Sequence, residues 1–143
     1  MDARPFRILT EDCRDALRDL PDCSIDAVVT FAAAQTRPSA VVASAGITVP
    51  ALVGVGSLVR IVRPETTRRM YAAVAASATF ASITGGWHCG FLDSRSVGGL
   101  GCDSGSIPRA AQLALVRTLF GDWLDTTLKG AAPRPVPPGV LVE

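Results

Sequence analysis

Hydrophobic and polar positions follow a regular pattern at two places in the chain, near the beginning and near the end. Residues 6–9 form a short apolar run that favours a buried strand. The residues after it carry apolar side chains at helical spacing, and Pro21 ends that predicted helix. A second apolar strand is predicted over residues 25–29, interrupted only by Asp26. The helix presents one apolar stripe, formed by Cys13, Ala16, Leu17 and Leu20.

A strand, a helix and a strand of these lengths predict a parallel pair joined by a right-handed crossover. The fold class expected is therefore α/β, with a β-α-β unit at residues 6–30. Any small α/β unit shows this pattern, so the periodicity alone assigns no function.

The strongest helix signal in the chain covers residues 107–129. Ser106 is expected to cap it, Pro108 suits its first turn, and Gly130 ends it. This helix is expected to cover the sheet. Its predicted apolar face contains Leu113, Val116, Phe120, Leu124 and Leu128, broadened by Leu119 and Trp123. The sequence predicts one α/β domain over residues 1–130. A proline-rich tail at 131–143 is expected to be disordered or polyproline-like.

The middle of the chain supports two interpretations. Residues 38–59 and 70–92 contain no charged side chain and are long enough to cross a bilayer, with four arginines between them. They therefore predict a membrane hairpin as an alternative to a soluble domain. Glycine and Pro50 in the first stretch instead favour short strands, at residues 46–49 and 58–62, separated by turns. The second stretch is rich in helix-forming residues up to Ile83.

Charge and cysteine content narrow the possible functions. The net charge of +1 provides no general attraction for nucleic acid. The cysteines at 13, 23, 89 and 102 have neither CxxC nor zinc spacing, and His88 beside Cys89 does not make a metal site alone. Reduced thiols in a cytoplasmic protein are therefore expected, with no metal.

Residues 7–30 contain the run ILTEDCRDALRDLPDCSIDAVVT. This run resembles the N-terminal segment of DNA amino-methyltransferases, in which a strand ends in an acidic residue, a helix ends in LPD and the next strand reads S-[IV]-D-x-[IVL]-[IVL]-T. The resemblance covers 24 of the 143 residues. It implies a partial Rossmann-like fold, S-adenosylmethionine as cofactor, DNA as partner, and methylation of adenine or cytosine amino groups. It also implies that Asp12 lies near the cofactor, although Asp12 is equally suited to capping the following helix.

The family's catalytic box, Asp or Asn followed by Pro-Pro and an aromatic residue, should follow Thr30. Phe31, Ala32, Ala33 and Ala34 stand there instead, and none of them can accept a hydrogen bond from a flipped base. No catalytic residue is therefore assigned, and a truncated or catalytically impaired relative is expected. An abrupt end of resemblance at Phe31, followed by Ala-, Val-, Gly- and Arg-rich sequence, is also what a shifted reading frame in a GC-rich gene produces.

Residues 96–106 are rich in glycine and precede the C-terminal helix, so they predict either a surface loop or an anion-binding turn. Within them, Cys102, Asp103 and Ser104 form a possible nucleophile group, with His88 as the only histidine.

Overall fold

The computed structural model describes residues 25–92 and 102–143. They form a mixed α/β structure with a four-stranded sheet, so the predicted α/β class is confirmed. The elements follow in the order β1 (Val28–Phe31), α2 (Ala40–Ser44), β2 (Ala51–Gly56), α3 (Pro64–Ala73), β3 (Ala78–Ile83), the 3-10 turn η1 (His88–Phe91), α4 (Arg109–Lys129) and β4 (Val140–Val142).

The strands lie in the spatial order β1-β2-β3-β4. Strands β1, β2 and β3 are parallel, with Val28 opposite Ala51 and Ala51 opposite Ala78. Strand β4 runs antiparallel to β3, with Val140 opposite Ile83. The two parallel connections pass through α2 and α3, as expected when parallel strands need a long crossover.

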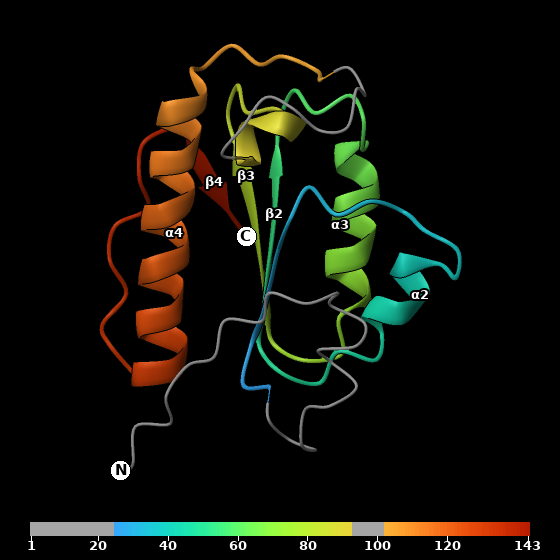
Figure 1. Cartoon of the computed structure of the whole chain (residues 1–143). Helices are drawn as coiled ribbons and strands as arrows, with labels where there is room; N and C mark the ends of the chain where they lie inside the picture. The colour runs from blue at the N-terminus through green and yellow to red at the C-terminus, as the bar shows by residue number, and fades with distance from the viewer. Residues whose placement is uncertain (1–24, 93–101) are drawn as a thin grey trace.

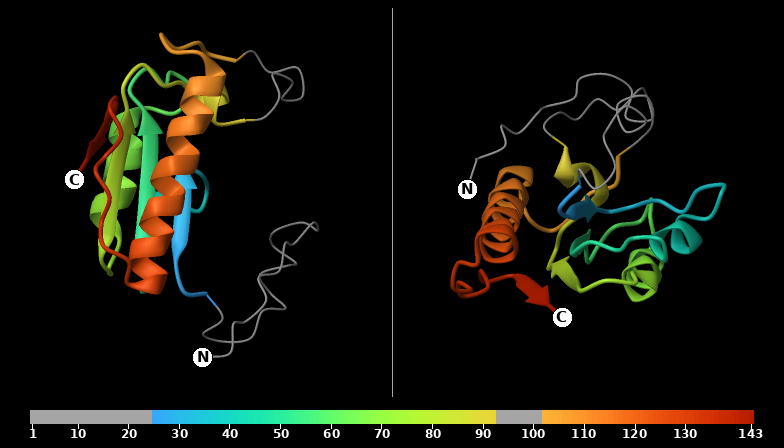
Figure 2. Two further views of the ribbon diagram at one scale, coloured as in Figure 1. Left: turned by 90° about the vertical axis from the view of Figure 1, so that its left-hand side faces the viewer. Right: turned by 90° about the horizontal axis from the view of Figure 1, so that it is seen from below.

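Helices cover both faces of the sheet (Figures 1 and 2). Alternate residues of β2 point to opposite faces, because successive side chains of a strand alternate. Leu52 belongs to the cluster packed against α4, whereas Val53 and Val55 belong to the cluster that includes Tyr71 of α3. The described residues therefore form two small cores, one on each side of the sheet.

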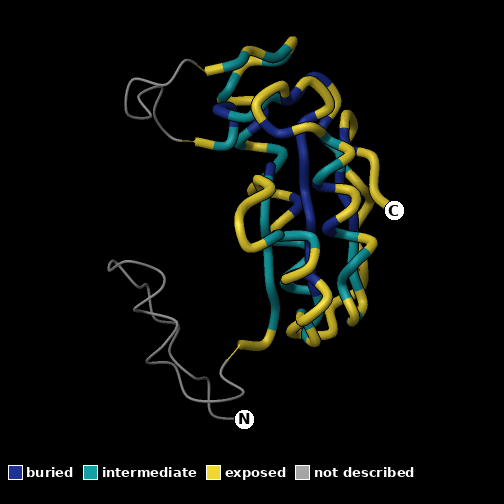
Figure 3. Tube along the Cα trace, turned by 90° about the vertical axis from the view of Figure 1, so that its right-hand side faces the viewer, coloured by how far each residue is buried: buried dark blue, intermediate teal, exposed yellow. Residues whose placement is uncertain are grey.

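Every residue of β2 is buried, as Figure 3 shows along the length of the strand. A parallel strand between two others is covered on both faces and reads as an unbroken apolar run. Its two glycines are sites of close approach: a Cβ at Gly54 would lie 2.3 Å from the ring of Phe31, and one at Gly56 would lie 2.3 Å from the carbonyl carbon of Gly86. They do not mark the turns that the sequence predicted.

The second strand of the predicted β-α-β unit is present as β1. It begins at Val28 and continues to Phe31, two residues past the predicted end at 29. The predicted strand at 6–9, the helix after it and Asp12 lie outside the described residues.

The prediction of two membrane-spanning helices is wrong for the stretches at 38–59 and 70–92. The first stretch contains α2 and β2, and the second contains the end of α3, then β3 and η1. Within the described ranges, no helix is both long enough and apolar enough to span a membrane.

The predicted short strands at 46–49 and 58–62 are also wrong. The observed strand of this region is β2, which lies between the two predicted ones. The stretch up to Ile83, whose residues favour a helix, contains the strand β3. The backbone of β3 pairs with β2 on one side and β4 on the other. Hydrogen bonds from both neighbours therefore outweigh the weak helix preference of small residues.

The predicted helix over 107–129 is confirmed as α4, and Gly130 ends it in the left-handed conformation with φ +67°. Two details differ. The N-cap position belongs to Pro108 rather than Ser106, and no side chain caps the helix. The predicted apolar face is confirmed in part: Leu119 is buried and Val116 and Trp123 pack against the core, whereas Phe120 and Leu128 are exposed.

The prediction of a disordered tail is wrong for its last residues. Val140 is buried in the core beneath α4, and the backbone of Glu143 exchanges two hydrogen bonds of 2.9 Å with Phe80 of β3. The side chain of Glu143 also forms a two-pronged ion pair with Arg68 of α3, at 2.5 and 2.9 Å. The proline-containing segment leads the chain from α4 back to the edge of the sheet.

Candidate functional site

The parallel strands β1, β2 and β3 all end at the same edge of the sheet, at the top of Figure 1. In open α/β sheets, ligands bind outside the carboxyl ends of the strands, where the loops leave room. At this edge the loop after β2, the residues after β3 with η1, and the segment 102–108 before α4 come together. This edge is therefore the first place to look for a site.

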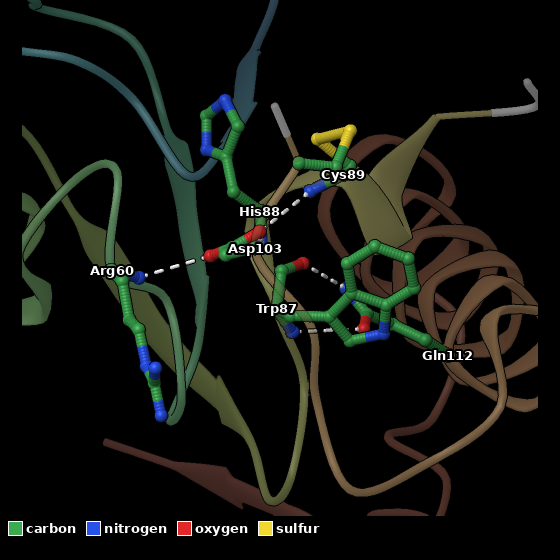
Figure 4. Close-up of a disulfide and its surroundings, with 7 residues drawn as sticks. Arg60, Trp87, His88, Cys89, Asp103 and Gln112 are labelled. Atoms are coloured by element: carbon green, nitrogen blue, oxygen red, sulfur yellow. Dashed lines mark hydrogen bonds between the residues drawn. A yellow bond between two sulfur atoms is a disulfide. The ribbon is translucent and has the colours of Figure 1, made fainter. Parts of the chain in front are cut away.

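Asp103 joins these three segments through its carboxylate (Figure 4). The backbone N–H of Arg60, in the loop after β2, donates to Oδ2 at 2.9 Å. The backbone N–H groups of His88 and Cys89, in η1, donate to Oδ1 at 3.0 and 3.4 Å. A carboxylate that accepts several backbone N–H groups holds loops in place without regular secondary structure. The role of Asp103 is thus to fix the geometry of the carboxyl edge.

A disulfide between Cys89 and Cys102 lies beside Asp103 (Figure 4). The prediction of reduced thiols is wrong for these two residues. The two cysteines are 13 positions apart and do not form a familiar motif, so the sequence did not indicate that they pair. The close approach depends on the turn η1 and on the path of segment 102–108, which place the two Cα atoms 5.7 Å apart. Cys13 and Cys23 lie outside the described residues.

Gln112 of α4 forms two hydrogen bonds with the backbone of Trp87, the residue that precedes η1. Its side-chain oxygen accepts a hydrogen bond from the backbone N–H of Trp87 at 3.0 Å, and its NH₂ group donates to the Trp87 carbonyl at 2.9 Å. Gln112 is fully buried, so both backbone groups depend on it for their partners. Gly90 allows this contact, since a Cβ there would lie 2.3 Å from the Gln112 oxygen.

A cavity of about 480 Å³ opens at this edge. One side of it is formed by Trp87, and the other by the start of α4 and the segment that leads into it. Its lining residues in the described part of the chain are Trp87, Cys102, Asp103, Ser104, Gly105, Ile107, Pro108 and Arg109. A volume of this size matches sites that take a small organic molecule.

The described lining of this cavity carries one positive group, Arg109, and one negative group, Asp103. Arg109 is the first residue of α4, where the helix dipole disfavours a cation. The first turn holds no acidic residue, and Nη1 of Arg109 is buried without a hydrogen-bond partner in the described part of the chain. The oxygens of Asp103 already accept backbone N–H groups. The cavity therefore suits a ligand with an anionic group.

A second hollow, of about 200 Å³, lies between α4 and the returning tail. Its walls are mainly apolar and include Trp123, Pro135 and Val142. The indole Nε1 of Trp123 donates to Thr79 at 3.1 Å, so its polar group is already used within the protein. This hollow is smaller and lies away from the carboxyl edge, and we regard it as a packing feature.

The position that the catalytic box would occupy is filled by an aromatic contact. Phe31, at the end of β1, stacks on Phe91 of η1 with ring centroids 5.3 Å apart, and it covers Gly54. The next residue, Ala32, is 4% exposed and has a φ of +52°. The structure thus shows apolar packing where the resemblance would require a hydrogen-bond acceptor.

The possible nucleophile group at 102–104 is not assembled as a catalytic site. Cys102 is in the disulfide, so it provides no thiolate. Asp103 contacts the backbone of His88, whereas the imidazole Nδ1 of His88 is buried and has no hydrogen-bond partner among the described residues. Of the glycine-rich stretch 96–106, residues 96–101 lie outside the described part. In residues 25–92 and 102–143, no group of three His, Cys, Asp or Glu residues is placed to hold a metal ion.

Asp12, the one cofactor-binding residue that the resemblance implied, cannot be placed relative to this cavity because it lies outside the described residues. The residues that form the site, Arg109 and Gln112, were missed by the sequence analysis. Asp103 was noted there only as part of a nucleophile group. The one local signal for Asp103 in the sequence was its position as an acidic residue shortly before a predicted helix.

Comparison with known proteins adds no relative: the chain matches no model of a protein family, and no curated protein is similar to it in sequence.

Proposed function

We propose that this protein is a small-molecule-binding α/β domain whose ligand occupies the cavity at the carboxyl edge of the sheet. Following the resemblance of residues 7–30 to DNA amino-methyltransferases, the proposed ligand is S-adenosylmethionine, held by a partial Rossmann-like unit. The observation that carries the proposal is the cavity itself. It is of ligand size, lies where α/β sheets bind small molecules, and contains Arg109, whose Nη1 is buried without a hydrogen-bond partner in the described chain.

The chemistry of the lining suits such a ligand. S-adenosylmethionine carries a carboxylate, an ammonium, a sulfonium and a purine ring, so its match to this lining depends on the carboxylate and the ring. The guanidinium of Arg109 provides paired donors for a carboxylate. The indole of Trp87 provides a flat apolar surface for the ring. Asp12 would contribute to the same site if the implied role of that residue holds.

We further propose that the protein does not transfer the methyl group. Transfer to an exocyclic amino group needs an acceptor next to the flipped base, and an aromatic ring to stack on it. Phe31 stands at the first position of the box and is held in its stack on Phe91. DNA remains the partner that the resemblance implies, but the net charge of +1 supplies no electrostatic support for it.

Calorimetric titration with S-adenosylmethionine tests the binding proposal. The full-length protein is expected to bind it, and Arg109→Gln is expected to weaken binding about 10-fold or more, the effect of one charge-assisted hydrogen bond. Arg69→Gln is the matched control, because Arg69 is an exposed arginine of α3. It should leave the affinity unchanged. A lack of binding at millimolar S-adenosylmethionine contradicts the proposal.

An assay with S-adenosylmethionine labelled in its methyl group, and unmethylated DNA as acceptor, tests the second part. No label is expected in the DNA. Transfer of label that is lost in Arg109→Gln would show that the protein is an enzyme after all.

A further inference from the structure

We propose that the Cys89–Cys102 disulfide is a redox latch on the cavity: its reduction releases segment 102–108 from η1 and opens the ligand site. The inference rests on the proposed function only in treating the cavity as a ligand site. The latch itself is a property of the disulfide and its contacts.

The disulfide joins the two walls of the cavity. Cys102 and Asp103 line one wall, and Trp87, two residues before Cys89, forms the other. Cys89 is 3% exposed, so one end of the bond is anchored in the interior. Cys102 is exposed, and it belongs to the segment that leads into α4. The bond therefore connects a fixed element to a surface segment.

Most described non-covalent contacts of residues 102–106 are made with the same stretch of chain. The N–H of Arg60 also donates to Asp103, and Ile107 packs against the core cluster that includes Leu52 and Leu119. Asp103 accepts from the backbone of Cys89 itself and of His88. Gly105 packs against the indole of Trp87, since a Cβ there would lie 2.2 Å from its Cδ1. The backbone N–H of Ser106 donates to the carbonyl of Gly85 at 3.0 Å.

Residues 102–106 thus lie along residues 85–89, and the disulfide closes one end of this contact. The described partners of residues 102–106 are a few hydrogen bonds and one glycine–indole contact, whereas Ile107 packs against the core. Segments held by few buried apolar contacts open locally at low cost. Without the covalent link, the attachment of residues 102–106 would depend on non-covalent contacts.

The reduction is a thiol–disulfide exchange with a dithiol reductant. A thiolate of the reductant attacks Sγ of the exposed Cys102, the S–S bond breaks, and the Cys89 thiolate leaves and takes up a proton. The second thiolate of the reductant then attacks the mixed disulfide and releases Cys102 as a thiolate, which is protonated in turn. The protein gains two electrons and two protons, and the reductant becomes a disulfide.

Tryptophan fluorescence measures the latch directly. The chain has two tryptophans, so Trp123→Phe leaves Trp87 as the only indole reporter. On reduction with dithiothreitol, the emission of Trp87 is expected to shift to longer wavelength, and its quenching by acrylamide to increase. Both changes should reverse on reoxidation. Alkylation followed by peptide mass analysis confirms that Cys89 and Cys102 have become thiols.

Two variants separate a latch from general unfolding. In Trp87→Phe the remaining reporter is Trp123, on the far part of α4, and its emission should stay constant on reduction. The double variant Cys89→Ser/Cys102→Ser should show the reduced-type Trp87 signal in the Trp123→Phe background, without any response to dithiothreitol. An unchanged Trp87 signal after proven reduction overturns the latch. So does an equal change at Trp123, which would indicate loss of the whole fold.

Repeating the S-adenosylmethionine titration with and without dithiothreitol distinguishes failure of the latch from failure of the proposed function. An affinity for S-adenosylmethionine that differs several-fold between the oxidised and the reduced protein supports both the latch and the proposed function. Equal binding in the two states overturns the latch as a control of this site. If Trp87 responds to reduction while S-adenosylmethionine binds to neither state, the latch is supported and the proposed ligand is rejected.

Discussion

At the scale of single residues, this fold depends on a few positions where backbone segments approach closely or a buried polar side chain serves several partners. Asp103 and Gln112 connect loops that have no strand pairing of their own. Gly56 allows the end of β2 to contact the backbone of Gly86, and the N–H of Leu58 donates to the Gly86 carbonyl at 2.8 Å. These contacts set the positions of the loops around the cavity.

Substitution of glycine by alanine should have opposite effects at two sites. Gly56→Ala places a Cβ 2.3 Å from backbone atoms that cannot rotate away, so we expect unfolding to become easier by about 1–3 kcal/mol. Gly121→Ala, in α4, has no atom within 4 Å of the new Cβ and should stabilise by about 0.5–1 kcal/mol through helix propensity. Urea denaturation measures both. Equal midpoints would show that the two backbones do not approach at Gly56.

At the scale of elements, the returning tail is a structural part of the sheet. Strand β4 covers the edge of β3, and its first residue reaches the core below α4. The three residues of β4 differ in burial: Val140 is buried, whereas Leu141 and Val142 are exposed. Helix α4 is oriented by the same core, which selects the face around Leu119 and Trp123.

The two neighbouring residues Val140 and Leu141 provide a matched test of this arrangement. Val140 is 7% exposed and Leu141 is 66% exposed. Val140→Ala removes two buried methyl groups and should destabilise by about 1–3 kcal/mol. Leu141→Ala should change the free energy of unfolding by less than about 0.5 kcal/mol. Thermal or urea unfolding of the two variants measures both changes in the free energy of unfolding. Similar small losses at both positions would mean that β4 does not dock.

At the scale of the whole molecule, one charged contact links α3, the sheet and the end of the chain. The guanidinium of Arg68 lies 4.4 Å from the ring centroid of Phe80 and pairs with Glu143. The hydrogen bond from Arg68 holds the pKa of the Glu143 carboxyl below its usual value of 4.5. Burial opposes this shift less strongly, and the positive charge of Arg68 adds a smaller lowering effect. Both side chains are about half exposed, so the contribution to stability is small and sensitive to salt.

This contact predicts the direction of one pH effect. The pKa of Glu143 is lower in the folded than in the unfolded protein, so the stabilisation is fully present above the unfolded value of 4.5 and is lost as pH falls through the lowered value. The difference in urea midpoint between the native protein and Glu143→Gln should therefore shrink from about pH 6 to about pH 3. Added salt should also reduce it. A constant difference across this range contradicts the pairing.

Much of the α/β class was predictable from the sequence, because its signals are local. Residues 25–29 form a short apolar run that favours a strand. The observed strand β1 covers Val28–Phe31, a few residues further along the chain. The limits of α4 follow from helical periodicity and from Gly130, whose left-handed conformation ends the helix. The buried face of α4 followed only in part, because apolar residues surround this helix on most sides.

The site was largely unpredictable, because its residues are joined by the fold rather than by spacing. Cys89 and Cys102 approach only through the path of the chain around η1. Gln112 is a polar residue in a helix, and nothing around it in the sequence indicates complete burial. Phe31 was recognised as standing in the place of a catalytic group, but its stacking on Phe91 depends on a residue 60 positions later.

The sequence by itself determined where α4 begins and ends within a few residues, where β1 lies, and that the position after Thr30 carries no acceptor. These features depend on the chemistry of neighbouring residues. The tertiary structure decided that residues 51–56 and 78–83 are strands, that the tail returns as β4, and that Asp103 and the disulfide form the carboxyl edge. Alanine, valine, serine and glycine have only weak local preferences, so partners distant in the sequence determine the conformation they adopt.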